Sequence, residues 1–189
     1  MNINIYFVKG NCISTSRRRV RHQPLLAAAQ YRANMIPWLG QWTWQNPIAI
    51  TLTCRKKHRR ERGIFPSATL DDVKQNLRHV LNRVNNNKDI FGNQGKRGEK
   101  RLQVVTVVEQ NLDGRYHFHL QVDVPPGKTP DFLASIIELE WKKSCWGDRI
   151  NHTQPVRDNG WLMYMLKLPT KRDYDLPIDV DDFHQTKNS

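Results

Sequence analysis

The sequence has few cysteines and no long apolar run. Three cysteines occur in 189 residues, at Cys12, Cys54 and Cys145, and no two of them have CxxC spacing. This odd number argues against a disulfide framework or a cysteine-based zinc site, and it fits a reducing cytosol. The longest apolar segment falls far short of a membrane span, and no basic region followed by an apolar run stands at the N-terminus. We therefore expect a soluble, cytoplasmic protein that is not secreted and has no membrane partner.

Acidic residues are scarce in the first half of the chain. The formal net charge is +12, and residues 1–100 alone carry a balance of +14, against −2 for residues 101–189. The positive charge is concentrated in residues 16–22 and 54–63, and such a local field suits a polyphosphate backbone. The alternative is a solvated or localisation tract. From the second run we predict DNA contacts by Arg55, Lys56, Lys57, Arg59, Arg60 and Arg62.

Strand and helix patterns alternate along most of the chain. Apolar and β-branched residues predict strands over residues 47–55, 102–109, 115–124 and 149–156. Helical spacing predicts helices over residues 69–84, 129–146 and 159–168. We expect a polar loop over residues 85–101. The order is that of a split βαββαβ unit, so we predict an α+β fold with a ferredoxin-like antiparallel sheet, helices on one face and the active site on the open face.

Three segments of the chain are expected to differ in role. Residues 46–172 form the main domain. Residues 1–45 form an N-terminal extension of unclear role, with a helical pattern at 24–35 and an aromatic cluster at 38–44. Residues 173–189 form an acidic tail that we expect to be flexible.

Two histidines interrupt the apolar pattern of one predicted strand. Because side chains alternate along a strand, His117 and His119 share a face with Gln121, whereas Tyr116 points to the helices. Two imidazoles in this arrangement can chelate one metal ion. The alternative is a surface or structural pair. Gln121, on the same face, is a candidate DNA contact.

The turn before this strand determines whether a third metal ligand is available. If residues 112–114 form a three-residue loop with Gly114 in the left-handed conformation, Glu109 faces His117. A two-residue turn would instead pair Glu109 with Phe118, on the other face. Two imidazoles and one carboxylate suit Mn²⁺ or Mg²⁺ and leave positions open for a phosphate oxygen. The alternative for Glu109 is a solvated strand end.

A tyrosine near the end of the chain is a candidate nucleophile. Tyr164 and Lys167 are three residues apart, so they share a face of the last predicted helix. A phenol has a reference pKa of about 10, so a nearby cation such as Lys167 would help it to act as a phenolate. Lys171 is a candidate contact to backbone phosphate. The alternative is that Tyr164 is a core aromatic, because its neighbours are mostly apolar.

Three segments together resemble the motifs of the HUH endonuclease superfamily, in which U stands for a hydrophobic residue. "AITLTC" (49–54) is similar to the first motif, "HFHLQV" (117–122) to the His-U-His motif, and "YMLK" (164–167) to the Tyr-x-x-Lys motif. Glu109 stands eight residues before the first histidine, where the family usually places its acidic ligand. More narrowly, the segments resemble the small rolling-circle replication initiators of plasmids, single-stranded DNA viruses and phages.

The resemblance implies a metal-dependent transesterification on single-stranded DNA at a replication origin, carried out by residues 46–172. Tyr164 would attack the phosphate, stay linked to the 5′ side and free a 3′-OH, and the reverse reaction would rejoin the strand. Only one tyrosine stands at the motif, since Tyr174 is ten residues on, which favours the single-tyrosine class.

The expected partners and the alternative functions depend on which other motifs the chain carries and on the lysine of the third motif. The chain has no GxxxxGK[ST] sequence, so a host helicase and polymerase are expected partners. Lys167 favours a replication initiator, since the related short transposases usually carry Gln there. The alternatives are a single-tyrosine transposase or a relaxase. An alternative of another class is a non-catalytic, ferredoxin-like module that binds nucleic acid.

Overall fold

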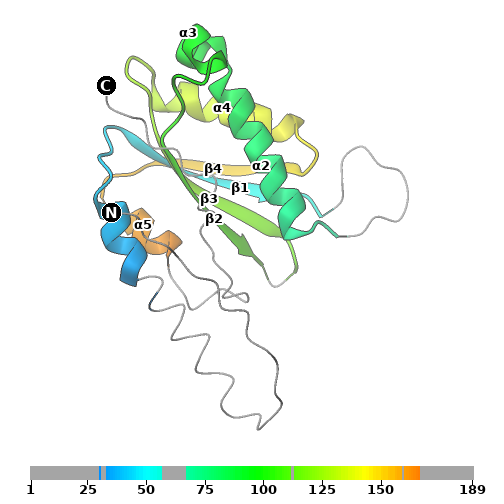
Figure 1. Ribbon diagram of the computed structural model, residues 1–189. Coiled ribbons are helices and arrows are strands. Elements are labelled where there is room, and N and C mark those ends of the chain that lie inside the picture. Colours follow the sequence, from blue (N-terminus) through cyan, green and yellow to red (C-terminus); the bar gives the residue numbers. More distant parts are fainter. Residues whose placement is uncertain (1–29, 31–32, 57–66, 112, 159, 167–189) are drawn as a thin grey trace, which may run out of the picture.

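A four-stranded antiparallel sheet is the centre of the fold (Figure 1). The computed structural model describes residues 30, 33–56, 67–111, 113–158 and 160–166. Its labelled elements are, in order, β1 (Pro47–Cys54), α2 (Leu70–Asn85), α3 (Lys88–Lys96), β2 (Val104–Gln110), β3 (Tyr116–Asp123), α4 (Pro130–Lys143), β4 (Gly147–Pro155) and α5 (Gly160–Met165). The strand order is β2-β3-β1-β4, and each neighbouring pair is antiparallel. The predicted α+β, ferredoxin-like sheet is confirmed.

Helices α2 and α4 begin at the threonines that the sequence marks as caps. The Thr69 hydroxyl accepts the amide of Asp72 at 3.2 Å, and the Asp72 carboxylate accepts the Thr69 amide at 3.0 Å, which completes a capping box. Thr129 caps α4 through its hydroxyl alone, which accepts the amide of Phe132 at 3.3 Å, and Pro130 occupies the first turn. Both helices pack on one face of the sheet, as predicted (Figure 1). No helix in the described part of the chain is long and apolar enough to cross a membrane.

The main core lies between these helices and the sheet. Trp141 of α4 is fully buried and meets Phe118 of β3 edge-on, with ring centroids 5.9 Å apart. Its indole N–H donates to the carbonyl of Thr53 at 2.9 Å. Phe118 and Leu120 point into this core, so the alternate residues of β3 point to the opposite face. The buried side of β3 thereby determines where the two histidines point.

The polar loop predicted over residues 85–101 is wrong for the part that forms α3. Asn87 caps this helix by accepting the amide two residues on at 2.9 Å, and Ile90 is buried in its first turn. At Gly92 the backbone has a φ of 60°, which glycine tolerates, and the helix is kinked there. The segment contains few apolar residues, so their spacing does not reveal a helix.

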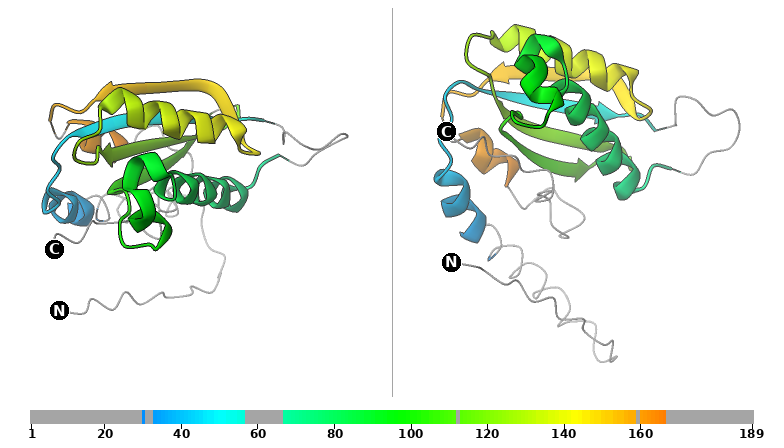
Figure 2. Two further views of the ribbon diagram at one scale, coloured as in Figure 1. Left: turned by 90° about the horizontal axis from the view of Figure 1, so that it is seen from above. Right: turned by 45° about the horizontal axis from the view of Figure 1, so that its top comes forward.

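The face of the sheet opposite α2 and α4 is covered in part rather than left open. Residues 33–40 form a helix, and Met35 and Leu39 pack with Val105 and Val107 of β2 and with α5. Figure 2 shows this helical segment and α5 close together at one end of the sheet. Both valines are fully buried by this packing, and the burial of their apolar surface stabilises the fold. The N-terminal extension therefore contributes to a second apolar layer.

Candidate active site

The turn between β2 and β3 places Glu109 on the face of the two histidines. The amide of Asn111 donates to the carbonyl of Arg115 at 2.9 Å, and the amide of Gly114 donates to the carbonyl of Asn111 at 2.9 Å. Gly114 has a φ of 82°, the left-handed conformation that a three-residue loop requires. The strand register then pairs Glu109 with His117. The register predicted from the longer turn is confirmed.

Each histidine of β3 contacts a threonine of β1. Thr51 lies opposite His119 in the sheet, and Thr53 lies opposite His117. The Thr51 hydroxyl oxygen is 3.1 Å from Nδ1 of His119, and that of Thr53 is 3.3 Å from Nδ1 of His117. The alternating threonines of the first motif therefore orient both imidazoles, a role that the sequence alone did not reveal.

His119 is buried and contacts the candidate carboxylate. It is 8% exposed, and its Nε2 lies 3.1 Å from Oε2 of Glu109. Because a carboxylate only accepts, this contact requires a proton on Nε2. The Glu109 side chain is 15% exposed, so it is not the solvated strand end of the alternative interpretation.

His117 is half-buried and has its second nitrogen directed to an amide. Its Nε2 lies 2.6 Å from Nδ2 of Asn111, which can only donate, so Nε2 accepts and Nδ1 carries the proton. Burial lowers the pKa of His117, and the charge of Arg115 lowers it further, whereas Glu109 and Asp113 oppose the shift. The ring is thus held neutral, the form of imidazole that binds metal ions.

Helix α5 brings the candidate nucleophile to the same face. The ring of Tyr164 stacks on Trp161, with centroids 5.2 Å apart and an interplanar angle of 17°. Both rings meet His119 edge-on, each with its centroid 5.8 Å from that of the imidazole. The indole N–H of Trp161 donates to the carbonyl of Leu120 at 3.2 Å, which ties α5 to β3. Tyr164 is 41% exposed, so the alternative of a core aromatic does not describe it.

The candidate metal ligands are the mixed nitrogen and oxygen donors expected for Mn²⁺ or Mg²⁺, namely Glu109, His117 and His119. Their chemistry fits the ion, because a hydroxyl holds each Nδ1 in the way that outer partners orient ligating histidines. Within the described ranges, no three His, Cys, Asp or Glu side chains are gathered closely enough to form a metal-binding group. A metal ion bound at Nε2 of both histidines would have to displace the proton between Glu109 and His119 and the contact of His117 with Asn111.

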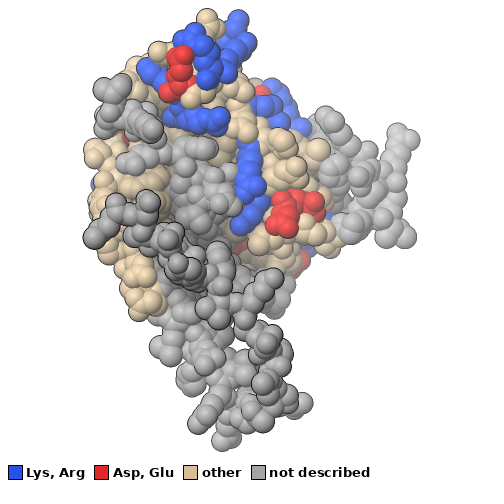
Figure 3. Space-filling view, viewed as in Figure 1, with Lys and Arg blue, Asp and Glu red and all other residues tan. Residues whose placement is uncertain are grey.

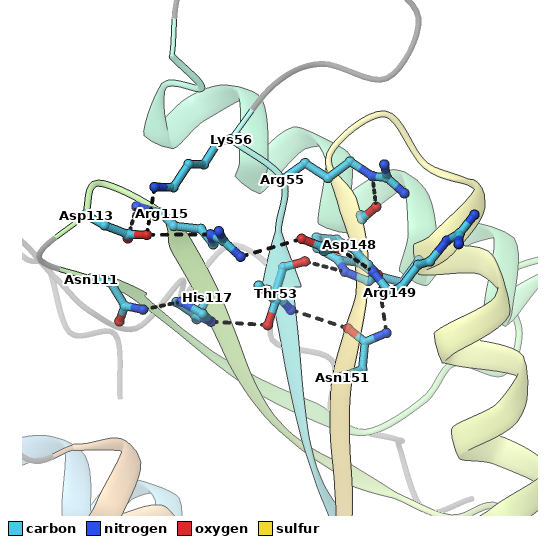
Figure 4. A network of polar contacts seen from close by, with 12 residues as sticks. Thr53, Arg55, Lys56, Asn111, Asp113, Arg115, His117, Asp148, Arg149 and Asn151 are labelled. Carbon is cyan, nitrogen blue, oxygen red and sulfur yellow. Dashed lines mark hydrogen bonds and ion pairs between the residues drawn. The ribbon is translucent and has the colours of Figure 1, made fainter.

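A network of polar contacts crosses the end of the sheet beside His117 (Figure 4). Lys56 Nζ lies 3.0 Å from the carboxylate of Asp113. Arg115 lies between two carboxylates, 3.8 Å from Asp113 and 3.6 Å from Asp148. Sequence reasoning missed Arg115, although it stands two residues before His117 and therefore on the same face of the strand.

The predicted DNA contacts are only partly within the described residues. Arg55 donates to the carbonyl of Gly147, beside the network of Lys56. Gln121 is 2% exposed, and its buried Oε1 has no hydrogen-bond partner among the described residues. It pairs with Val105 under the second apolar layer, so its side chain does not reach a surface where DNA would lie. The other predicted residues lie outside the described part of the chain: Lys57, Arg59, Arg60, Arg62, Lys167, Lys171 and the tail at 173–189.

Positive charge also gathers at a second segment of the sequence, outside the predicted basic run. Helix α3 and the residues after it include Lys88, Lys96, Arg97 and Lys100. Figure 3 shows Lys and Arg side chains gathered at this end of the molecule. Because α3 packs beside α2, this charge lies on the helical side of the sheet and not on the histidine face.

Comparison with known proteins identifies no relative. No protein-family model, no curated protein and no solved structure matches the chain. The functional interpretation therefore rests on the geometry of the site and on the three short motifs.

Proposed function

We propose that this protein is a single-tyrosine HUH endonuclease that nicks and rejoins single-stranded DNA to initiate rolling-circle replication. The observation that carries the proposal is the contact of Tyr164 with His119, on the face that also holds Glu109 and His117. Residues of the three motifs, which are far apart in the sequence, meet at this point. The threonines of the first motif hold the histidines of the second, and one of these histidines meets the tyrosine of the third.

In the proposed reaction, the phenolic oxygen of Tyr164 forms a bond to the scissile phosphorus while the bond from phosphorus to the 3′ oxygen breaks. The phenol loses its proton, the leaving strand gains a 3′-OH, and the 5′ phosphate stays on the tyrosine. The phosphotyrosine keeps the energy of the broken bond, so the reverse reaction rejoins the strand without a nucleotide cofactor. A divalent ion bound by Glu109, His117 and His119 would supply Lewis acidity at the phosphate.

The protein's own groups have positioning roles in this scheme. Thr51 orients the imidazole of His119, and Trp161 stacks on the ring of Tyr164. Lys167, proposed to favour the phenolate, lies outside the described residues. In the cytosol of a host cell, the free 3′-OH would be extended by a host polymerase while a host helicase separates the strands.

An adduct assay tests this proposal. A 3′-labelled library of single-stranded oligonucleotides is incubated with the full chain and Mn²⁺, and covalent products are separated on a denaturing gel. The label has to be at the 3′ end because the tyrosine retains the downstream fragment. Tyr164→Phe is expected to abolish the adduct and keep DNA binding. Tyr116→Phe is the matched control, because Tyr116 packs against the helices on the other side of β3.

The histidines are tested in the same assay. His119→Ala is expected to remove metal-dependent nicking, whereas His79→Ala, on an exposed position of α2, should leave it unchanged. An adduct that persists in Tyr164→Phe would show that another group is the nucleophile. Binding of single strands with no adduct at all would favour the non-catalytic module. Sequencing the joined fragments then separates a replication initiator from a transposase or a relaxase.

A further inference from the structure

A pocket opens beside Tyr164, between the end of β4 and the start of α5. Its volume is about 680 Å³, and it is lined by residues 154–158, Gly160, Trp161 and Tyr164. This volume is in the range of roughly 300–1,000 Å³ that is typical of small-molecule sites. Since Tyr164 forms part of the wall, a group bound in the pocket lies next to the candidate nucleophile.

One wall of the pocket is an aromatic platform. The rings of Trp161 and Tyr164 are stacked within 17° of parallel, and the indole is anchored by its hydrogen bond to Leu120. His119 supports both rings by edge contacts. A rigid aromatic platform of this kind binds flat π-systems, and nucleobases stack on such side chains in proteins that hold single-stranded DNA.

The rim of the pocket carries polar side chains that are exposed. Within the described part of the chain, the side chains of Gln154 and Arg157 make no hydrogen bond or ion pair. Asp158 differs, because its carboxylate accepts the amide of Gly160 at 2.7 Å. Gln154 can both donate to and accept from the edge of a base, and Arg157 presents a guanidinium suited to a phosphate.

We infer that this pocket binds one nucleobase of the DNA strand, next to the scissile phosphate. The base stacks on the Trp161–Tyr164 platform with its edge toward Gln154, and its phosphate faces Arg157. An apolar ligand would make no use of the amide or the guanidinium, and a free phosphate would not use the platform. The inference rests on the proposed function, which supplies the single strand.

The test compares two fluorescent probes on the full chain, in EDTA so that no cleavage occurs. One probe is a 20-nucleotide single strand of random sequence, and the other is an abasic strand with the same number of phosphates. Fluorescence anisotropy measures the preference for the strand that carries bases. Trp161→Ala is expected to reduce this preference by about 5- to 150-fold, the usual contribution of one stacked base. Trp161→Phe should keep most of it, whereas Trp161→Leu should lose it as the alanine variant does.

A second variant keeps the inference testable if substitutions at Trp161 disturb folding. Arg157→Gln changes an exposed side chain without partners among the described residues. It should weaken binding of both probes and flatten the slope of log K against log salt by about 0.7, the effect of one lost phosphate contact on a single strand. An unchanged slope, or a preference that survives in folded Trp161→Ala and Trp161→Leu, would overturn the inference.

The outcome also separates this inference from the proposed reaction. Adduct formation by the unaltered protein is measured in parallel, with Mn²⁺ in place of EDTA. An adduct together with an unchanged base preference in the Trp161 variants overturns the pocket alone. Loss of the base preference without any adduct overturns the proposed nickase and supports the pocket as a site for a base.

Discussion

Replacing Thr51 by valine is expected to weaken Mn²⁺ binding while the fold is kept. The Thr51 hydroxyl lies 3.1 Å from Nδ1 of His119, a residue that is 8% exposed. Its loss removes the Thr51 partner of a buried ring nitrogen, at a cost of about 1–3 kcal/mol in the free energy of unfolding. Removal of such an outer partner typically lowers metal affinity by about 10- to 100-fold. A methyl group replaces the hydroxyl, so the packing volume of β1 changes little.

Isothermal titration of Mn²⁺ into the full chain measures this effect. Thr153→Val is the matched control, because its hydroxyl bonds to Glu138 at 3.2 Å on the helical side of the sheet. The control should bind Mn²⁺ like the unaltered protein, and thermal unfolding should show that both variants are folded. If Thr51→Val bound Mn²⁺ with unchanged affinity, Thr51 would not position a metal ligand. The proposed ligand set, in which Thr51 orients His119, would then be refuted.

Three further substitutions test other parts of the structure. Arg115→Gln is expected to raise the pKa of His117, because the positive charge of Arg115 lowers that pKa; burial still keeps it below its ordinary value. An NMR titration that gives the same pKa of His117 in the variant would contradict this expectation. The lowered pKa of His117 means that the folded state binds fewer protons than the unfolded state. The free energy of unfolding therefore falls as the pH drops below the ordinary pKa of histidine, and it falls less steeply in the variant. Thr106→Val should raise the melting temperature, because the buried hydroxyl of Thr106 has no hydrogen-bond partner in the described part of the chain. Its removal relieves about 1–3 kcal/mol, and each kcal/mol raises the melting temperature by roughly 2–4 °C. Leu39→Ala should lower the free energy of unfolding by about 2–5 kcal/mol, because Leu39 is 2% exposed; a neutral result would exclude the second layer from the folded unit.

Much of the candidate site followed from local rules. Strand periodicity put His117 and His119 on one face, and the three-residue loop, one of the two turns considered, predicted that Glu109 stands opposite His117. The same periodicity put Gln121 on this face, but it did not reveal that the second apolar layer covers the residue. Alternation determines the direction of a side chain, whereas burial depends on what packs against it.

By itself, the sequence determined the α+β class, the order of the elements, the helix caps and the face of each strand residue. These features depend on spacing and capping within a few residues, so they can be read locally; α3 escaped because it has too few apolar residues to show a period. Only the tertiary structure decided that Thr51 holds His119, that Trp161 stacks on Tyr164, and that both rings meet the histidine. These contacts join segments distant in the sequence, and they exist because the chain packs on both faces of one sheet.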